Sequence, residues 1–240
     1  MEEQPYNHPL LGYDKPSFQQ QEELIEENYF VKLTFYITYV FLMTTATITF
    51  IEAITTDDVR ARHILNLETC ISVVATFFYS KFVKQLEDGV AYKQINIDRY
   101  TDWMITTPLM LLVLCLVFVY NTKTTLKLWT FFVVLMLNLG MILTGYLGEI
   151  DYINRTSANI LGFGFFAALF GYLYRTFLHK KYNFDNMIIF SSFFILWSLY
   201  GVFYEFDEQF KNVAFNILDL FAKCFVGIFF WAYFTKTFTL

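Results

Sequence analysis

Seven long apolar stretches, separated by short polar connections, constrain this chain more than any other feature of its sequence. Each is long enough to cross the ~30 Å hydrocarbon core of a bilayer as an α-helix. Helices and closed barrels are the only structures that satisfy every backbone polar group there. The predicted spans are residues 29–53, 64–82, 98–119, 126–147, 154–177, 186–204 and 212–235. The sequence therefore predicts an all-α, multi-pass integral membrane protein: a seven-transmembrane-helix bundle in which residues 29–240 form one domain.

The composition is typical of a membrane protein and does not favour an enzyme, a metalloprotein or a nucleic-acid-binding protein. Of the 240 residues, 56% are hydrophobic and 16% are charged, whereas about 25% are charged in an ordinary soluble domain. The chain has no Gly-rich phosphate loop, no His/Cys metal cluster and no basic patch for nucleic acid. We therefore expect no enzyme, no metal site and no nucleic-acid partner. Cys70, Cys115 and Cys224 lie within predicted spans without metal-ligand spacing, so we expect buried packing thiols.

The distribution of charge in the connections predicts the orientation. Residues 1–28 are acidic and lack the pattern of a signal peptide. If they lie outside as an extracellular tail, the inner loops and the C-terminal tail hold Arg60, Arg62, Lys123, Lys127, Arg175, Lys180, Lys181 and Lys236. The outer connections then hold Glu87, Asp88, Glu149, Asp151, Glu205, Asp207 and Glu208. Because Lys and Arg accumulate in cytoplasmic loops, we predict an outer N-terminus and a cytoplasmic C-terminus.

The last span carries two charged residues in its interior, Asp219 and Lys223. Each costs about 2.5–3.5 kcal/mol at mid-membrane depth. Their i, i+4 spacing places both on one helix face, where an ion pair could simply lower the cost of insertion. A buried lysine can also lose its proton and condense with an aldehyde to give a Schiff base. This helix alone leaves both interpretations open.

The third span adds a second charged stripe. Its string DRYTDWMITTPLMLL begins at Asp98. Arg99, Asp102 and Thr106 follow at i, i+3 and i+7, so a cation, a carboxylate and a hydroxyl share one helix face. Charged groups on two separate spans point to a functional site within the bundle.

These two spans together resemble the microbial (type 1) rhodopsins, and bacteriorhodopsin in particular. The strings that carry the resemblance are RYxDWxxTTPL (99–109) and DxxxK (219–223). WSLY (197–200) and MILTG (141–145) match segments that line the chromophore in that family. The resemblance extends over about residues 30–236 and leaves the N-terminal tail unmatched.

The resemblance implies that Lys223 carries all-trans retinal as a protonated Schiff base. It implies that Asp102 and Asp219 are the counterions and that Arg99 balances the second carboxylate. Asp102 would be the first proton acceptor, with Thr106 as its hydrogen-bonding partner. The other residues that match family positions near the chromophore are Tyr79, Trp103, Thr107, Met110, Asn138, Met141, Gly145, Trp197, Tyr200 and Tyr204.

Within this set the resemblance gives two tyrosines a specific role. The hydroxyls of Tyr79 and Tyr200 are expected to hold Asp219 in its ionised form. Tyr204 departs from the family, which has a tryptophan there, so the pocket gains a hydroxyl.

Three further departures bear on proton transfer. Asn138 replaces an aspartate, so Thr107 and Asn138 should form an uncharged hydrogen bond between helices. Val113, eleven residues after Asp102, replaces the acid that reprotonates the Schiff base in outward pumps. Glu68 in the second span could supply that proton instead, since burial should keep its carboxyl protonated in the dark. It could also be a cytoplasmic gate, or a side chain that snorkels to the inner interface.

At the outer side, Lys211 stands where bacteriorhodopsin has one of two proton-releasing glutamates. Glu205, Asp207 and Glu208 are the acidic alternatives nearby.

These residues predict a light-driven outward proton pump with its donor moved to the second span. A light-gated cation channel is the second hypothesis, because hydroxyls that could line a water path recur along the first span: Thr34, Thr38, Thr44, Thr45, Thr47 and Thr49. Rhodopsins of large algal viruses, which this chain resembles through its glutamate in the second span, include both kinds. A sensor with a separate transducer is a third class. The expected partners are membrane lipid and the transported proton or cation, and family resemblance implies a homo-oligomer, a trimer or pentamer.

Overall fold

The computed structural model describes residues 18–179 and 181–235, and these residues form helices and short connections without a strand. The predicted tail lies outside the described residues up to position 17, as do Lys180 and Lys236. The α-helices are α1 (Phe18–Thr55), α2 (Val59–Glu87), α3 (Tyr92–Thr122), α4 (Leu128–Glu149), α5 (Arg155–Leu173), α6 (Phe184–Phe203), α7 (Glu208–Asp219) and α8 (Val226–Thr235). Two π-helical segments complete them: η1 (Tyr174–Leu178) extends α5, and η2 (Leu220–Phe225) joins α7 to α8.

Because α7, η2 and α8 follow one another without a break, the chain makes seven rods, as predicted. Among the described helices, six are long and apolar enough to cross a membrane. The remaining rod, α2, carries charged residues near both ends, including Arg60, Arg62, Lys84 and Glu87. The seven-helix fold is confirmed.

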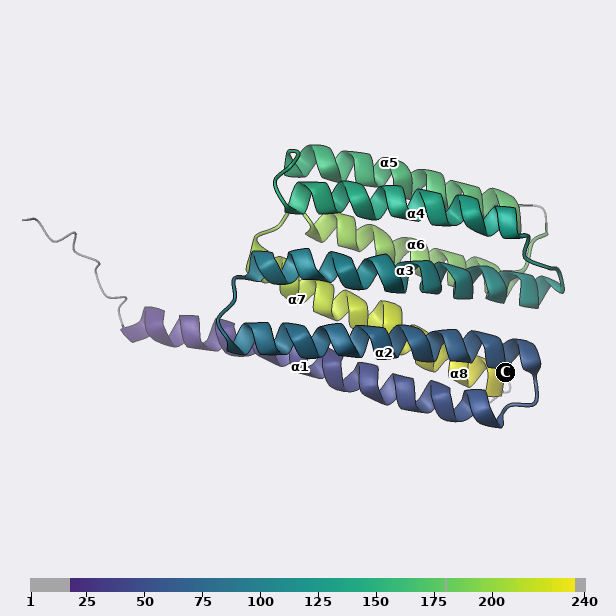
Figure 1. Cartoon of the computed structure of the whole chain (residues 1–240), viewed down its shortest axis with the longest axis horizontal. Helices are drawn as coiled ribbons and strands as arrows, with labels where there is room; N and C mark the ends of the chain where they lie inside the picture. The colour runs from purple at the N-terminus through teal and green to yellow at the C-terminus, as the bar shows by residue number, and fades with distance from the viewer. Residues whose placement is uncertain (1–17, 180, 236–240) are drawn as a thin grey trace, which may run out of the picture.

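The rods lie roughly side by side in one bundle (Figure 1). α4 and α5 pack together on one side and α1 and α2 on the other, with α3, α6 and the α7–α8 rod between them (Figure 1). One end of the bundle, here the N-terminal end, carries the connections 88–91, 150–154 and 204–207. The opposite C-terminal end carries 56–58, 123–127 and, after η1, the described residues 179 and 181–183.

Several helices are longer than their predicted spans. α3 begins at Tyr92 rather than at residue 98, and α2 begins at Val59 rather than at residue 64. The side chain of Asp58 caps α2 by accepting hydrogen bonds from the backbone N–H groups of Arg60 and Ala61. An apolar run marks only the part of a helix within hydrocarbon, so polar first and last turns were missed. Residues 18–28, which the sequence assigns to the N-terminal tail, are continuous with α1, which begins at Phe18.

The cysteine prediction was correct for two residues and wrong for one. Cys115 and Cys224 are buried, whereas Cys70 is exposed. Cys70 lies on the face of α2 that points away from the bundle, because an apolar membrane helix is bounded by lipid as well as by protein.

Candidate functional site

Lys223 lies within η2, in the middle of the bundle, and only 2% of its side chain is exposed. Its Nζ atom is 2.6 Å from Oδ2 of Asp102 on α3 and 3.5 Å from Oδ2 of Asp219 at the end of α7. Both carboxylates are fully buried. Because an unpaired charge is costly in such a place, the three groups stabilise one another.

Asp219 is held by groups from three other helices. The hydroxyl of Tyr79 donates to Oδ2 at 2.8 Å, and the hydroxyl of Tyr200 donates to Oδ1 at 2.6 Å. Arg99 Nη1 lies 3.4 Å from Oδ2. The hydrogen bonds predicted from Tyr79 and Tyr200 are therefore present. These charge-assisted contacts fix the position of the Asp219 carboxylate beside Lys223.

Arg99 is fully buried and is held mainly by amides that the sequence analysis missed. Its Nη2 donates to Oδ1 of Asn216 at 2.8 Å and to Oδ1 of Asn212 at 3.2 Å. Its Nη1 donates to the hydroxyl oxygen of Tyr79 at 3.0 Å. These partners fix the guanidinium between Asp219 and the N-terminal end of the bundle.

Asp102 makes fewer contacts than Asp219. Its Oδ2 binds Lys223, while its Oδ1 is buried without a hydrogen-bond partner in the described part of the chain. The expected bond from Thr106 to this carboxylate is not present. The Thr106 hydroxyl donates to the main-chain oxygen of Asp102 at 2.9 Å, since a helical threonine readily bonds the carbonyl four residues earlier.

The four charged groups balance. Arg99 and Lys223 supply two positive charges, and Asp102 and Asp219 supply two negative ones. The site as a whole is formally neutral when all four are ionised, which lowers the cost of its burial.

A pocket extends from Lys223 between α3, α4, α5 and α6. Predicted residues that line it are Trp103, Thr107, Met110, Met141, Gly145, Trp197, Tyr200, Tyr204, Asp219 and Lys223. Lining residues that were missed are Tyr100, Ile142, Ala158, Asn159, Gly162, Phe163, Phe166, Gly201 and Phe215. The second group comes largely from α5, where the sequence shows no polar motif.

The pocket fits a long apolar ligand with an aldehyde end. Its walls are mostly apolar and include eight aromatic side chains, and Lys223 and Asp219 are its charged lining residues in the described chain. A Cβ atom at Gly145 would lie 2.7 Å from the hydroxyl oxygen of Tyr100, so the pocket needs a glycine there. The described residues contain no group of three or more His, Cys, Asp or Glu side chains that could hold a metal ion.

The predicted bond between α3 and α4 is present beside this pocket. Asn138 Nδ2 donates to Oγ1 of Thr107 at 2.9 Å, and the Thr107 hydroxyl donates to the main-chain oxygen of Trp103 at 2.6 Å. Asn138 is fully buried. The bond is uncharged, as expected.

Glu68 lies on the other side of Lys223 from Asp102, toward the C-terminal end. A Cβ atom at Gly227 would lie 3.3 Å from its Oε2, and Gly227 follows Lys223 by about one helical turn of ~6 Å. Glu68 is 2% exposed, so it does not snorkel to an interface. Val113 is fully buried in the apolar core, as its side chain requires.

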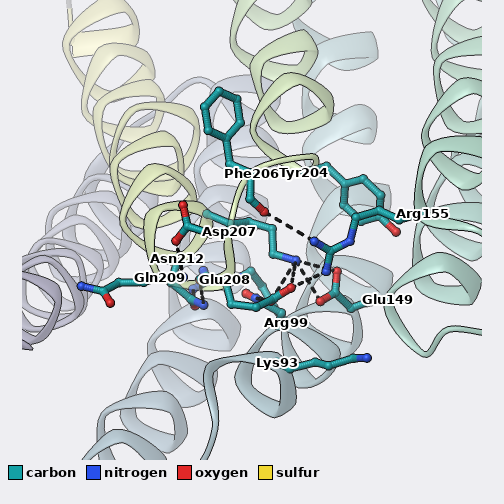
Figure 2. A network of polar contacts seen from close by, with 12 residues as sticks. Lys93, Arg99, Glu149, Arg155, Tyr204, Phe206, Asp207, Glu208, Gln209 and Asn212 are labelled. Atoms are coloured by element: carbon teal, nitrogen blue, oxygen red, sulfur yellow. Dashed lines mark hydrogen bonds and ion pairs between the residues drawn. The ribbon is translucent and has the colours of Figure 1, made fainter. Parts of the chain in front are cut away.

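At the N-terminal end, a second set of charged groups converges from three helices (Figure 2). Lys211 and Glu149 are buried and paired at 2.9 Å, and Glu208 binds both Lys211 and Arg155. The sequence placed Glu149 among the charges of the outer connections. In the structure it is the last residue of α4, and its side chain is buried within the bundle.

A family model described as bacteriorhodopsin-like protein matches residues 30–237. No curated protein sequence matches the chain. Among solved structures, the chain is similar to viral rhodopsin OLPVRII, with 53% identity and a TM-score of 0.83 over 87% of this chain and 99% of that one.

Two more distant structures show the fold alone. The proton-pumping rhodopsin AR2 from the marine alga Acetabularia acetabulum is 19% identical, with a TM-score of 0.72 over 87% of this chain and 96% of that one. Xanthorhodopsin, described as a light-driven ion pump with a dual chromophore, is 16% identical, with a TM-score of 0.70 over 86% and 92%.

Proposed function

The chain belongs to the bacteriorhodopsin-like family of microbial rhodopsins, and from this premise we propose that it is a light-driven outward proton pump. The observation that carries the proposal is the position of Lys223 between two carboxylates on one side and the solitary Glu68 on the other. A proton can then leave Nζ toward one end of the bundle and be replaced from the other.

Lys223 would hold all-trans retinal as a Schiff base in the pocket that extends from its amine. When bound, retinal supplies light absorption and an isomerisation that changes the proton affinity at Nζ. Trp103, Trp197 and Tyr200 line the pocket and orient an elongated apolar ligand. A side chain at position 145 would collide with the Tyr100 hydroxyl, and the glycine leaves that space free.

Asp102 is the better proton acceptor of the two carboxylates. It is the nearer to Nζ, at 2.6 Å against 3.5 Å for Asp219. Asp219 already accepts from two tyrosines and faces Arg99, so protonating it would break several contacts. Asp102 loses only its bond to Lys223, because its Oδ1 has no partner in the described chain.

Glu68 is the proton donor in this proposal. Glu68 is 2% exposed, and in this proposal it holds its proton in the dark, as a donor must. Its Oε2 lies near Gly227, so the proton approaches Nζ from the C-terminal end. The basic residues of the C-terminal-end loops support a cytoplasmic position for that end, since Lys and Arg accumulate in cytoplasmic loops. Transport would then run outward.

A light-gated cation channel is the alternative, and one observation favours it. Thr38, Thr45 and Thr49 are buried and face the bundle, and the Thr45 hydroxyl has no partner among the described residues. Such hydroxyls could bind water along α1. Thr44 and Thr47 instead point outward and donate to their own helix, so these two residues do not belong to the stripe.

Photocurrent at zero voltage under symmetric solutions separates these functions. A pump gives an outward current that persists against a modest opposing potential, whereas a channel current reverses at the equilibrium potential of its ion. We expect the outward current.

The donor assignment has its own test, Glu68→Gln. Reprotonation of the Schiff base should slow by about 10²-fold or more, the usual worth of a positioned proton donor. Glu52→Gln is the matched control, since it removes a carboxylate from α1 at the same end without touching Lys223. Unchanged late-cycle kinetics in Glu68→Gln would show that the donor lies elsewhere.

A further inference from the structure

The charged cluster at the N-terminal end is built around a lysine that has no access to solvent. Nζ of Lys211 lies 2.9 and 3.0 Å from the two oxygens of Glu149. It also lies 3.1 Å from Oε1 of Glu208. The Lys211 side chain is 0% exposed and that of Glu149 is 1% exposed. A buried ion pair of this kind is stable only while both partners remain.

The cluster joins the ends of several helices. Glu208 of α7 forms an ion pair with Arg155 at the start of α5 and accepts a hydrogen bond from Asn96 of α3 at 2.6 Å. Glu149 adds the end of α4. Figure 2 shows Glu149, Arg155 and Glu208 directed toward one another at this end of the bundle. Two acids and two bases leave the cluster without net charge.

Tyr204 lies between this cluster and the retinal pocket. Its ring centroid is 5.5 Å from Nζ of Lys211 and 5.8 Å from Cζ of Arg155, within the range of cation–π attraction. Its hydroxyl donates to the main-chain oxygen of Gly145 at 3.0 Å, and both residues line the pocket. The same side chain therefore forms part of the pocket wall and supports the charged cluster.

We propose that Glu149, Arg155, Glu208 and Lys211, here the N-terminal latch, seal this end of the bundle and keep water and small polar solutes from Lys223. Tyr204 is the positioning residue that couples the latch to the pocket. The proposal rests on the retinal-binding part of the proposed function. In this proposal Lys211 and Glu149 neither transfer a proton nor contact retinal. Their role is to close this end of the bundle.

The rate at which hydroxylamine bleaches the pigment in the dark measures how well the latch excludes small polar solutes. The nitrogen of hydroxylamine replaces Nζ at the retinal carbon, which yields retinal oxime and the free amine of Lys223. The loss of visible absorbance then reports how readily a small polar molecule reaches Nζ. No ion transport is needed for this measurement.

Lys211→Met keeps most of the side-chain volume but leaves the Glu149 carboxylate buried without its cation. We expect bleaching at least about tenfold faster than in the unmodified protein, since such a charge draws in water or breaks the packing around it. Lys93→Met is the matched control. It removes one positive charge at the same end, from an exposed pair with Asp151.

A second variant, in which the charges remain balanced, keeps the proposal testable if Lys211→Met does not fold. Glu149→Gln combined with Lys211→Met removes the buried pair and leaves Arg155 paired with Glu208. Its bleaching rate should lie between those of the Lys93→Met control and the Lys211→Met variant. In the protein without retinal, both latch variants should also show faster hydrogen–deuterium exchange in residues 145–158 and 204–215, and Lys93→Met should not.

The outcomes separate the two proposals. If the unmodified protein forms no pigment, the proposed function is refuted, and so is the latch, since it rests on retinal binding. If pigment forms and both latch variants bleach and exchange like Lys93→Met, the latch is refuted while the proposed function stands. Faster bleaching in the latch variants alone supports it.

Discussion

Replacing Asn216 by leucine should weaken the site from a position that touches neither the pocket nor Lys223. The Asn216 side chain accepts from Arg99 Nη2 at 2.8 Å and donates to Oγ1 of Thr34 on α1 at 3.0 Å. Its Oδ1 also lies 3.1 Å from the Tyr79 hydroxyl, which would keep its shorter bond to Asp219. Leucine has a similar size but can make none of these bonds. Arg99 would keep Asn212, at the longer distance of 3.2 Å.

The magnitude follows from the kind of bond that is lost. A neutral hydrogen bond between membrane helices contributes only about 0.6 kcal/mol on average, and Thr34 also donates to the main-chain oxygen of Val31. A bond to a charged group contributes about 1.5–3 kcal/mol. The loss of the Arg99 bond therefore dominates, and we expect a destabilisation of about 2 kcal/mol. For a chain of this size that is a fall in Tm of about 4–8 °C.

Thermal unfolding of the purified protein, followed by helix circular dichroism, measures this change. A double-mutant cycle with Arg99→Gln isolates the contact. In the Arg99→Gln background, Asn216→Leu should cost about 1–2 kcal/mol less than it does alone. An equal loss of stability in both backgrounds would show that Asn216 acts through packing and that the reasoning from charge is wrong.

Two other predictions follow from the structure. Gly145→Ala should slow pigment formation by about tenfold or more, because the new methyl group would lie 2.7 Å from the Tyr100 hydroxyl. Tyr100→Phe in the same chain should restore much of the rate. Absorbance after the addition of retinal measures both rates. Burial raises the pKa of Asp58, but hydrogen bonds from the Tyr120 hydroxyl and from the backbone of Arg60 and Ala61 outweigh it and lower the pKa below its ordinary value. The resulting stabilisation is present at neutral pH and is lost as the pH falls through the lowered pKa. The Tm difference between the unmodified protein and Asp58→Asn should therefore shrink below about pH 4. A Tm difference that stays constant with pH would contradict this cause.

The sequence predicted the parts of the site that bear a strong local signal. Charged residues are rare within membrane spans, so Arg99, Asp102, Asp219 and Lys223 were identified individually, and the structure brings all four together. Their grouping follows from helix periodicity on α3 and α7. The bundle itself was predicted because an apolar run of membrane length has few structural alternatives.

Neutral and long-range features were harder to predict. Asn212 and Asn216 lie on the same face of the seventh rod as Asp219, at four-residue and three-residue steps, and that spacing could have identified them. The contact between Glu149 and Lys211 joins residues 62 apart in sequence, so no periodicity could reveal it. Glu149 also stands at the end of α4, where a charge normally faces solvent.

The two halves of the bundle are closed by different physical means. From Lys223 toward the N-terminal end, ion pairs and amide contacts run through Asp219 and Arg99 to Asn212, whose Nδ2 donates to the main-chain oxygen of Glu208 at 2.8 Å. A change of charge at Asp102 can reach the latch through this chain by electrostatics alone, because each member is held at hydrogen-bonding or ion-pair distance from the next.

Toward the C-terminal end, Glu68 is followed by a layer of apolar side chains. Ile64, Val113, Leu114, Val117, Phe118 and Phe230 are each at most 1% exposed. No change of charge opens such a layer, since apolar packing must separate before water can enter. In the proposed pump, release therefore requires only small shifts of charged groups, whereas proton uptake by Glu68 requires helices to move. The slow step of the cycle should accordingly be uptake from the C-terminal end, and it should respond to substitutions in this apolar layer more than to substitutions in the latch.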